Sequence, residues 1–298
     1  MSGIRLWGAQ LALFLSVFIF THQLVQAEPS GPVVRFAPLP MVSLEQMTRE
    51  YLPFLDYLEK RSGRRFELAY HASYDELLNA LVAGEVDLAY LGPLPYVALT
   101  EQTDSIIPIV QLLDSKGASD YTCAIVHFAD HPAELMHSGR PHRVALTQPL
   151  STCGYLSVER YLNQHQTSLE SEHYEYTYTG SHENVAMWVI LDDFDLGGIK
   201  TQIARRYQHL GLRIVDETDP VPGFVLVANR ATMDAGLIDL IRESMLSLHP
   251  RENESDRDVV RAWSANLRYG ARTVDEQAYE SIRNQWRELK VDLMRSAE

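Results

Sequence analysis

The stretch from Arg65 to Pro93, RFELAYHASYDELLNALVAGEVDLAYLGP, decides the fold. Its first seven residues alternate in the manner of a β-strand. A capping-box pair, Ser73 and Glu76, then opens a run with leucines at helical spacing, and Gly84 closes that run. The apolar segment VDLAYLGP predicts a second strand. Strand–helix–strand is the unit of a parallel sheet, so the stretch predicts an α/β fold.

The same alternation continues on both sides of this stretch. Apolar residues at helical spacing predict a helix over residues 44–58, which Gly63 ends and in which Pro53 either makes a kink or starts a second helix. Further helical patterns follow Ser151 and Ser181 and cover residues 233–248 and 279–293. Short apolar runs predict more strands: VVRFA (33–37), DYTCAIVHF (120–128), RVALTQP (143–149), YEYTYTG (174–180), FDLGGI (194–199) and FVLVANR (224–230).

Composition and missing motifs narrow the class of function. The chain has 298 residues, is 46% hydrophobic and carries a formal net charge of −14, which speaks against a nucleic-acid partner. It has no P-loop, no dinucleotide fingerprint, no nucleophile elbow and no zinc-protease helix. The 11 histidines show no paired Cys/His ligand spacing, so neither a metal nor a cofactor is expected. The sequence therefore indicates a binding protein rather than an enzyme.

The N-terminus carries a targeting pattern. Arg5 precedes the apolar run LALFLSVFIF (11–20), and Val25-Gln26-Ala27 fits the small-x-small pattern before a cleavage site. We expect a signal peptide over residues 1–27, cut after Ala27, and export to the periplasm. An uncleaved membrane anchor is the alternative, although the apolar run is short for a membrane span.

The segment PLSTCGY (149–155) places two hydroxyls and a thiol where a helix begins. The first turn of a helix has backbone N–H groups without partners, and its dipole favours negative charge. Ser151 and Thr152 therefore either cap the helix or help to bind an anion at its N-terminus.

Five blocks of sequence, taken in order, carry a family resemblance. They are YLPFLDYLEKRSGRRFEL, SYDELLNALVAGEVDLAYLGPLPYV, PLSTCGYL, TGSHENVAMWV and PVPGFVLV, within residues 33 to the mid-240s. Together they resemble the phosphonate/phosphite/phosphate (PhnD-like) substrate-binding proteins of ABC importers. The resemblance implies a type II periplasmic binding protein: two α/β lobes, a two-strand hinge and an interlobe ligand cleft. It places lobe one at residues 33–118 plus 222–298 and lobe two at residues 119–221.

The resemblance also implies a set of ligand-binding residues for a small oxyanion. Aligned on the blocks, the family's two tyrosines fall on Tyr74 and Tyr121, its hydroxyl pair on Ser151 and Thr152, and its histidine on His182. The hydroxyls would donate hydrogen bonds to the anion, and His182 would donate from either ring nitrogen, neutral or charged. The implied partner is an ABC permease in the inner membrane, and we expect a monomer.

One departure from the family concerns the substrate. Members that bind aminoalkylphosphonates hold the ammonium group with two carboxylates, and those positions carry Gln202 and Phe224 here. An amide and a ring cannot neutralise a buried ammonium. We therefore expect an oxyanion without an amine: phosphite, phosphate or a simple phosphonate.

A second departure concerns the two cysteines. Cys153 follows the hydroxyl pair, and Cys123 lies two residues from Tyr121, so it should share that face of the strand. The pair has three interpretations: a disulfide, two small buried side chains, or a thiol site for a soft oxyanion such as arsenite. The third interpretation gives the alternative function, a periplasmic oxyanion sensor that signals to a membrane histidine kinase.

Overall fold

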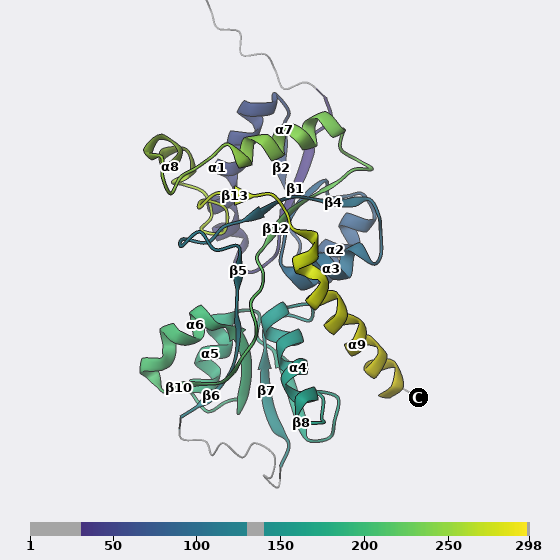
Figure 1. Cartoon of the computed structure of the whole chain (residues 1–298), viewed down its shortest axis with the longest axis vertical. Helices are drawn as coiled ribbons and strands as arrows, with labels where there is room; N and C mark the ends of the chain where they lie inside the picture. Colours follow the sequence, from purple (N-terminus) through teal and green to yellow (C-terminus); the bar gives the residue numbers. More distant parts are fainter. Residues whose placement is uncertain (1–30, 130–139, 297–298) are drawn as a thin grey trace, which may run out of the picture.

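The computed structural model describes residues 31–129 and 140–296, and the expected signal peptide lies outside them. Figure 1 shows two layered bodies, one above the other, with β5 running between them and α9 extending from the upper body beside the lower one. Each body is built around its own β-sheet, and helices cover both. Within the described ranges, no helix is both long enough and apolar enough to cross a membrane.

The first sheet has the strand order β13-β4-β12-β3-β1-β2. β1 pairs in parallel with β2 and β3, while β12 runs antiparallel to β3 and β4. Its strands are β1 (Val34–Pro38), β2 (Phe66–Leu68), β3 (Leu88–Leu91), β4 (Ile106–Leu112), β12 (Val225–Asn229) and β13 (Ala271–Arg272). The helices of this body are α1 (Leu44–Ser62), α2 (Tyr74–Val82), α3 (Pro93–Thr100), α7 (Ala235–Leu246), α8 (Glu254–Val260), the 3₁₀ turn Glu276–Tyr279 and α9 (Glu280–Ser296).

The second sheet has the order β10-β6-β9-β7-β8. Its strands are β6 (Cys123–Phe128), β7 (His142–Leu146), β8 (Tyr174–Tyr178), β9 (Leu196–Lys200) and β10 (Leu212–Glu217). Its helices are η1 (Thr152–Leu156), which continues directly into α4 (Ser157–Gln164), then α5 (His182–Ile190), α6 (Thr201–Tyr207) and a 3₁₀ turn, Gln208–Leu210. In both sheets, a strand that has just crossed from the other body, β6 or β12, runs antiparallel to its neighbours.

Two short strands connect the bodies. β5 (Asp120–Tyr121) and β11 (Val221–Pro222) pair antiparallel and lead directly into β6 and β12. The mixed α/β fold is confirmed, and the expected pair of crossing strands is present. The single strand expected over residues 120–128 is instead broken at Thr122 into β5 and β6, because its two parts pair with different partners.

The local signals in the sequence account for most of these elements. Ser73 Oγ accepts from the N–H of Glu76, and Ser181 Oγ caps α5 through the N–H of Asn184. Gly63 ends α1 with φ of +65°, a left-handed conformation that glycine adopts without strain. Pro53 lies inside one continuous α1, so the expectation of a second helix start is wrong. The buried face of α1 packs on the first sheet, where Phe54 meets Phe36 edge to face at 5.5 Å.

Candidate functional site

The five predicted ligand-binding residues line one small cavity between the two bodies. Tyr74 comes from α2, Tyr121 from β5, Ser151 and Thr152 from the start of η1, and His182 from α5. The volume open to the centre of a water-sized molecule is about 20 Å³, and one water needs roughly 10–15 Å³ in this measure. The structure thus brings together residues that are far apart in sequence, around a space that suits a very small ligand.

The start of η1 is both capped and open to a ligand. Ser151 Oγ accepts from the N–H of Gly154 at 3.0 Å, so the capping interpretation of this serine is confirmed. The carbonyl of Ser151 accepts from the N–H groups of Tyr155 and Leu156. Among the described residues, no hydrogen bond uses the N–H groups of Thr152 and Cys153. Two first-turn N–H groups therefore remain able to donate to an anion in the cavity.

Two glycines let η1 lie so close to the second sheet. A Cβ on Gly198 of β9 would lie 2.4 Å from the carbonyl oxygen of Cys153. A Cβ on Gly154 would lie 1.9 Å from Thr147 Oγ1. Backbone packing at these two positions therefore fixes where the Ser151–Thr152 segment stands.

The N-terminal residues of four helices line this cavity. Tyr74 and His182 are the first residues of α2 and α5, Gly92 is the N-cap of α3, and Ser151 is the N-cap of η1. No aspartate or glutamate is among the described residues that line the cavity. Because the N-terminal end of a helix carries about half a positive charge, the cavity has a positive field without a carboxylate to oppose it.

The two phenols are hydrogen-bond donors at any physiological pH. Burial raises the pKa of Tyr74, and the charges of Tyr121 and Tyr51 raise it further. Burial also raises the pKa of Tyr121, against a smaller opposing effect of its contact with the Thr152 hydroxyl. Both side chains therefore keep their protons and can donate them to an oxyanion.

His182 is neutral in this site. Burial, together with the positive charge of Lys200, lowers the pKa of His182 to about 3. Without a ligand, the neutral imidazole is therefore favoured over the charged one, because a second cation next to Lys200 is disfavoured. His182 Nδ1 is buried and has no hydrogen-bond partner in the described part of the chain. That orphaned nitrogen is one that a ligand atom would satisfy.

Lys200 is a lining residue of the cavity that the sequence reasoning missed. It is the last residue of β9, and its Nζ lies 4.1 Å from the ring centroid of Phe224 and 4.6 Å from that of Tyr121. Burial lowers the pKa of Lys200 to about 8, and the charge of Glu183 offsets part of that fall. One signal in the sequence could have identified Lys200: it stands at the end of an apolar strand. Ligands of α/β proteins bind at the carboxyl ends of the strands.

The cysteines form a disulfide. Cys123 Sγ and Cys153 Sγ are bonded, and neither cysteine of the chain is free. Cys153 lines the cavity, whereas Cys123 lines a neighbouring one, so only one of the two cysteines lines the predicted site. The break at Thr122 explains this, because Tyr121 and Cys123 do not share one continuous strand. Without a free thiol, nothing in the structure favours arsenite capture.

Gln202 lies beside the small cavity rather than in it. It lines a larger adjacent cavity of about 510 Å³, which shares Tyr121, Lys200 and Phe224 with the small cavity. Phe224 does line the small cavity, as the sequence comparison placed it.

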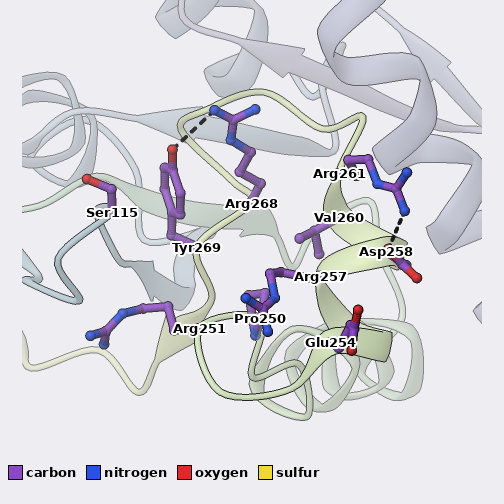
Figure 2. A pocket seen from close by; sticks show the side chains of 10 residues that line it. All are labelled: Ser115, Pro250, Arg251, Glu254, Arg257, Asp258, Val260, Arg261, Arg268 and Tyr269. Carbon is purple, nitrogen blue, oxygen red and sulfur yellow. Dashed lines mark hydrogen bonds and ion pairs between the residues drawn. The ribbon is translucent and has the colours of Figure 1, made fainter.

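A third cavity, of about 740 Å³, lies beside α8 and contains none of the predicted residues. Figure 2 shows four arginines around it, with Arg261 turned toward Asp258 and Arg268 donating to Tyr269 Oη at 3.1 Å. Most of these side chains are exposed, and two of the arginines are satisfied by near neighbours in the sequence. This cavity therefore has the character of a polar surface hollow rather than of a buried ligand site.

Comparison with known proteins agrees with this geometry. The model of the family described as ABC transporter, phosphonate, periplasmic substrate-binding protein matches residues 36–279. The phosphate-import protein PhnD of Mycolicibacterium smegmatis is 25% identical over 224 residues, which is 70% of each chain. The phosphonates-binding periplasmic protein of Escherichia coli is 21% identical over 228 residues, or 72% of this chain and 66% of that protein.

Solved structures show the same fold. PhnD1 of Prochlorococcus marinus, solved in complex with methylphosphonate, superposes with a TM-score of 0.71 at 18% identity. The superposition covers 87% of this chain and 98% of that one. The expected periplasmic binding protein fold is thereby confirmed.

Proposed function

Because the chain belongs to the family of periplasmic substrate-binding proteins of phosphonate ABC transporters, we propose that it captures phosphite, phosphate or a simple phosphonate without an amine. The family binds substrates and does not transform them, so the chain is not an enzyme. The proposed partner is an ABC permease of the inner membrane, to which the ligand-bound protein delivers its anion.

The observation that carries this proposal is the convergence of four helix N-termini on a cavity without a carboxylate. Isolated anion sites in proteins use this arrangement, since backbone N–H groups and helix dipoles stabilise negative charge without a counterion. A ligand with several equivalent oxygens uses more of these donors than a carboxylate could. The cavity's small size agrees with a compact oxyanion.

We assign each site residue a role. The N–H groups of Thr152 and Cys153, with the hydroxyls of Ser151 and Thr152, donate to the anion from one side. Tyr74 and Tyr121 donate from the other side, and His182 donates one hydrogen bond as a neutral imidazole. Hydrogen bonds to a charged partner contribute about 1.5–3 kcal/mol each, so a handful supports roughly micromolar or tighter binding.

The proposed mechanism is closure of two lobes about the β5–β11 pair. We propose that residues 33–118 with 222–298 form one lobe and residues 119–221 the other. Donors from both lobes face the cavity: Tyr74 belongs to the first, and Ser151, Thr152 and His182 to the second. A ligand that contacts both lobes binds the closed form better than the open one and shifts the equilibrium toward closure.

The exclusion of amines rests on the lining of the site. Phe224 stands where a carboxylate would hold an ammonium group, and no described lining residue is acidic. An ammonium buried in the small cavity would therefore have no partner, since the nearby aspartates Asp114 and Asp120 line the larger adjacent cavity instead.

Export is implied by the family, whose members are periplasmic. We propose that residues 1–27 are a signal peptide cut after Ala27 and that the mature protein acts as a monomer. Comparing the N-terminal sequence of protein from the periplasmic fraction with residue 28 onward tests the cleavage site.

Isothermal titration of the mature protein with phosphite, phosphate, methylphosphonate and sulfate tests the function. We expect at least one phosphorus oxyanion to bind with a Kd of roughly micromolar or below. Binding of sulfate alone, or of none of the four, overturns the proposal.

A further inference from the structure

Two cavities meet at the same three side chains. Tyr121, Lys200 and Phe224 line both the inner cavity of about 20 Å³ and the outer cavity of about 510 Å³. These three side chains therefore form the partition between the two spaces. If the oxyanion head occupies the inner cavity, as the proposed function has it, any organic substituent on that head has to reach the outer cavity past the partition.

The aromatic part of the partition is fixed. Phe224 stacks on Tyr90 with ring centroids 4.7 Å apart and an interplanar angle of 8°. On its other side, Phe224 lies 6.1 Å from the ring of Tyr121. The edge of the Phe224 ring also lies close to Gly92: a Cβ built on Gly92 would lie 3.4 Å from a carbon of the Phe224 ring. Lys200, whose side chain has four rotatable bonds, is the adjustable part of the partition.

Lys200 also lacks an ion pair within the described residues, although Glu183 acts on its charge from farther away. In the described part of the chain, no carboxylate forms an ion pair with Lys200 Nζ. The two arginines of the outer cavity do have such partners: Arg205 pairs with Glu217 at 3.2 Å, and Arg206 with Glu183 at 3.6 Å. The rings of Tyr121 and Phe224 solvate the Lys200 ammonium in part. An anionic group arriving at the partition would complete the missing ion pair.

We propose that Lys200 determines specificity by reading the charge of the ligand's organic substituent: it favours phosphonates with a carboxylate on that substituent and disfavours those with an ammonium. This inference rests on the proposed function, since it assumes that the phosphonate group occupies the inner cavity. An ammonium at the partition meets the Lys200 ammonium, whereas a carboxylate there gains a charge-assisted hydrogen bond; the two aspartates that line the outer cavity, Asp114 and Asp120, are not part of the partition.

Three phosphonates with a two-carbon substituent test the proposal: ethylphosphonate, 2-aminoethylphosphonate and phosphonoacetate. In titration calorimetry of the wild-type protein, phosphonoacetate should bind roughly tenfold or more tighter than ethylphosphonate, and 2-aminoethylphosphonate should bind weakest. In Lys200→Met, the three affinities should come within about threefold of one another. Lys200→Arg keeps the charge and should keep the order, and Lys60→Met, at an exposed position of α1, should leave all three affinities unchanged.

Thermal unfolding of each variant shows whether the fold is intact. If Lys200→Met does not fold, the proposal is decided by the wild-type order together with Lys200→Arg. An unchanged order of affinities in a folded Lys200→Met, or wild-type protein that binds 2-aminoethylphosphonate as tightly as phosphonoacetate, overturns the inference. Wild-type protein that binds phosphite but none of the three phosphonates also overturns it. Wild-type protein that binds no phosphorus oxyanion overturns the proposed function itself, a result distinct from the others.

Discussion

The hydroxyl oxygen of Thr152, in the first turn of η1, accepts a buried hydrogen bond of 3.0 Å from the backbone N–H of Leu94, in the first turn of α3. The two helices belong to different sheets, so this bond joins the two bodies at the wall of the small cavity. The Thr152 hydroxyl also contacts the Tyr121 phenol, and Thr152 lines the small cavity. The same side chain thus joins the two bodies at the wall of the proposed ligand site.

The first prediction concerns the hydroxyl pair. Ser151→Ala combined with Thr152→Ala removes two donors to the anion, the cap of η1 and the bond to Leu94. We expect the variant to lose the thermal stabilisation that phosphite or methylphosphonate gives the wild-type protein, measured as the shift in Tm at saturating ligand. Ser62→Ala combined with Thr48→Ala, both in α1, serves as the matched control and should retain the full shift. A full ligand-induced shift in the double variant at the site would contradict the account.

The second prediction concerns the disulfide. Cys123 and Cys153 are 30 residues apart in sequence, and their bond ties the start of β6 to the first turn of η1. Cys123→Ser combined with Cys153→Ser should lower the free energy of unfolding by about 2–4 kcal/mol. Urea unfolding of the wild-type protein with and without a reductant provides the matched comparison. Equal midpoints under both conditions would show that the bond does not form in solution.

The third prediction concerns acid stability and His182. Its pKa is about 3 in the folded protein against an ordinary value of 6.5, so the unfolded chain binds the proton more tightly. The stability that the neutral imidazole contributes is complete above pH 6.5 and is lost as the pH falls toward 3. Between pH 6.5 and 5 the loss amounts to up to about 2 kcal/mol. His182→Gln should remove this part of the pH dependence, measured by urea unfolding of both proteins at each pH. Parallel pH profiles for the two proteins would argue that His182 titrates normally.

The fourth prediction concerns alkaline pH and Lys200. The groups that act on its ammonium are the Tyr121 phenol, the neutral His182 and the paired Glu183. Its pKa is about 8 when folded against 10.5 ordinarily, so ligand-free protein gains stability as the pH rises from about 8 to 10.5. Affinity for an oxyanion should fall over the same range, since the cation is being lost. Both trends should be absent in Lys200→Met, and their persistence there would assign them to another group.

Much of the fold could be predicted from local signals, because each one acts within a few residues. The caps Ser73 and Ser181 and the stop at Gly63 mark the ends of helices, and alternating or apolar runs mark strands. Helix α3 was not predicted from the sequence, because it is buried on nearly all sides and so has no amphipathic pattern. Strand β10, at the edge of the second sheet, was not predicted either. Pairings between distant segments, such as those that split β5 from β6, leave no local trace.

The residues of the candidate site could be predicted only where they align with the blocks of sequence that carry the family resemblance. Tyr74, Tyr121, Ser151, Thr152 and His182 meet at one cavity, which no periodicity in the sequence could indicate. Lys200 lies outside the blocks of sequence that carry the family resemblance. Its position beside two aromatic rings depends on Phe224, which is distant in sequence and lies between β11 and β12. The state of the cysteines likewise depends on how close two distant segments fold.

The most direct test of the central claim is a crystal structure of the mature protein grown with methylphosphonate. The account predicts the phosphonate oxygens within hydrogen-bond distance of the N–H groups of Thr152 and Cys153 and of the phenols of Tyr74 and Tyr121. A phosphonate bound instead among the arginines beside α8, with the inner cavity filled only by water, would contradict it.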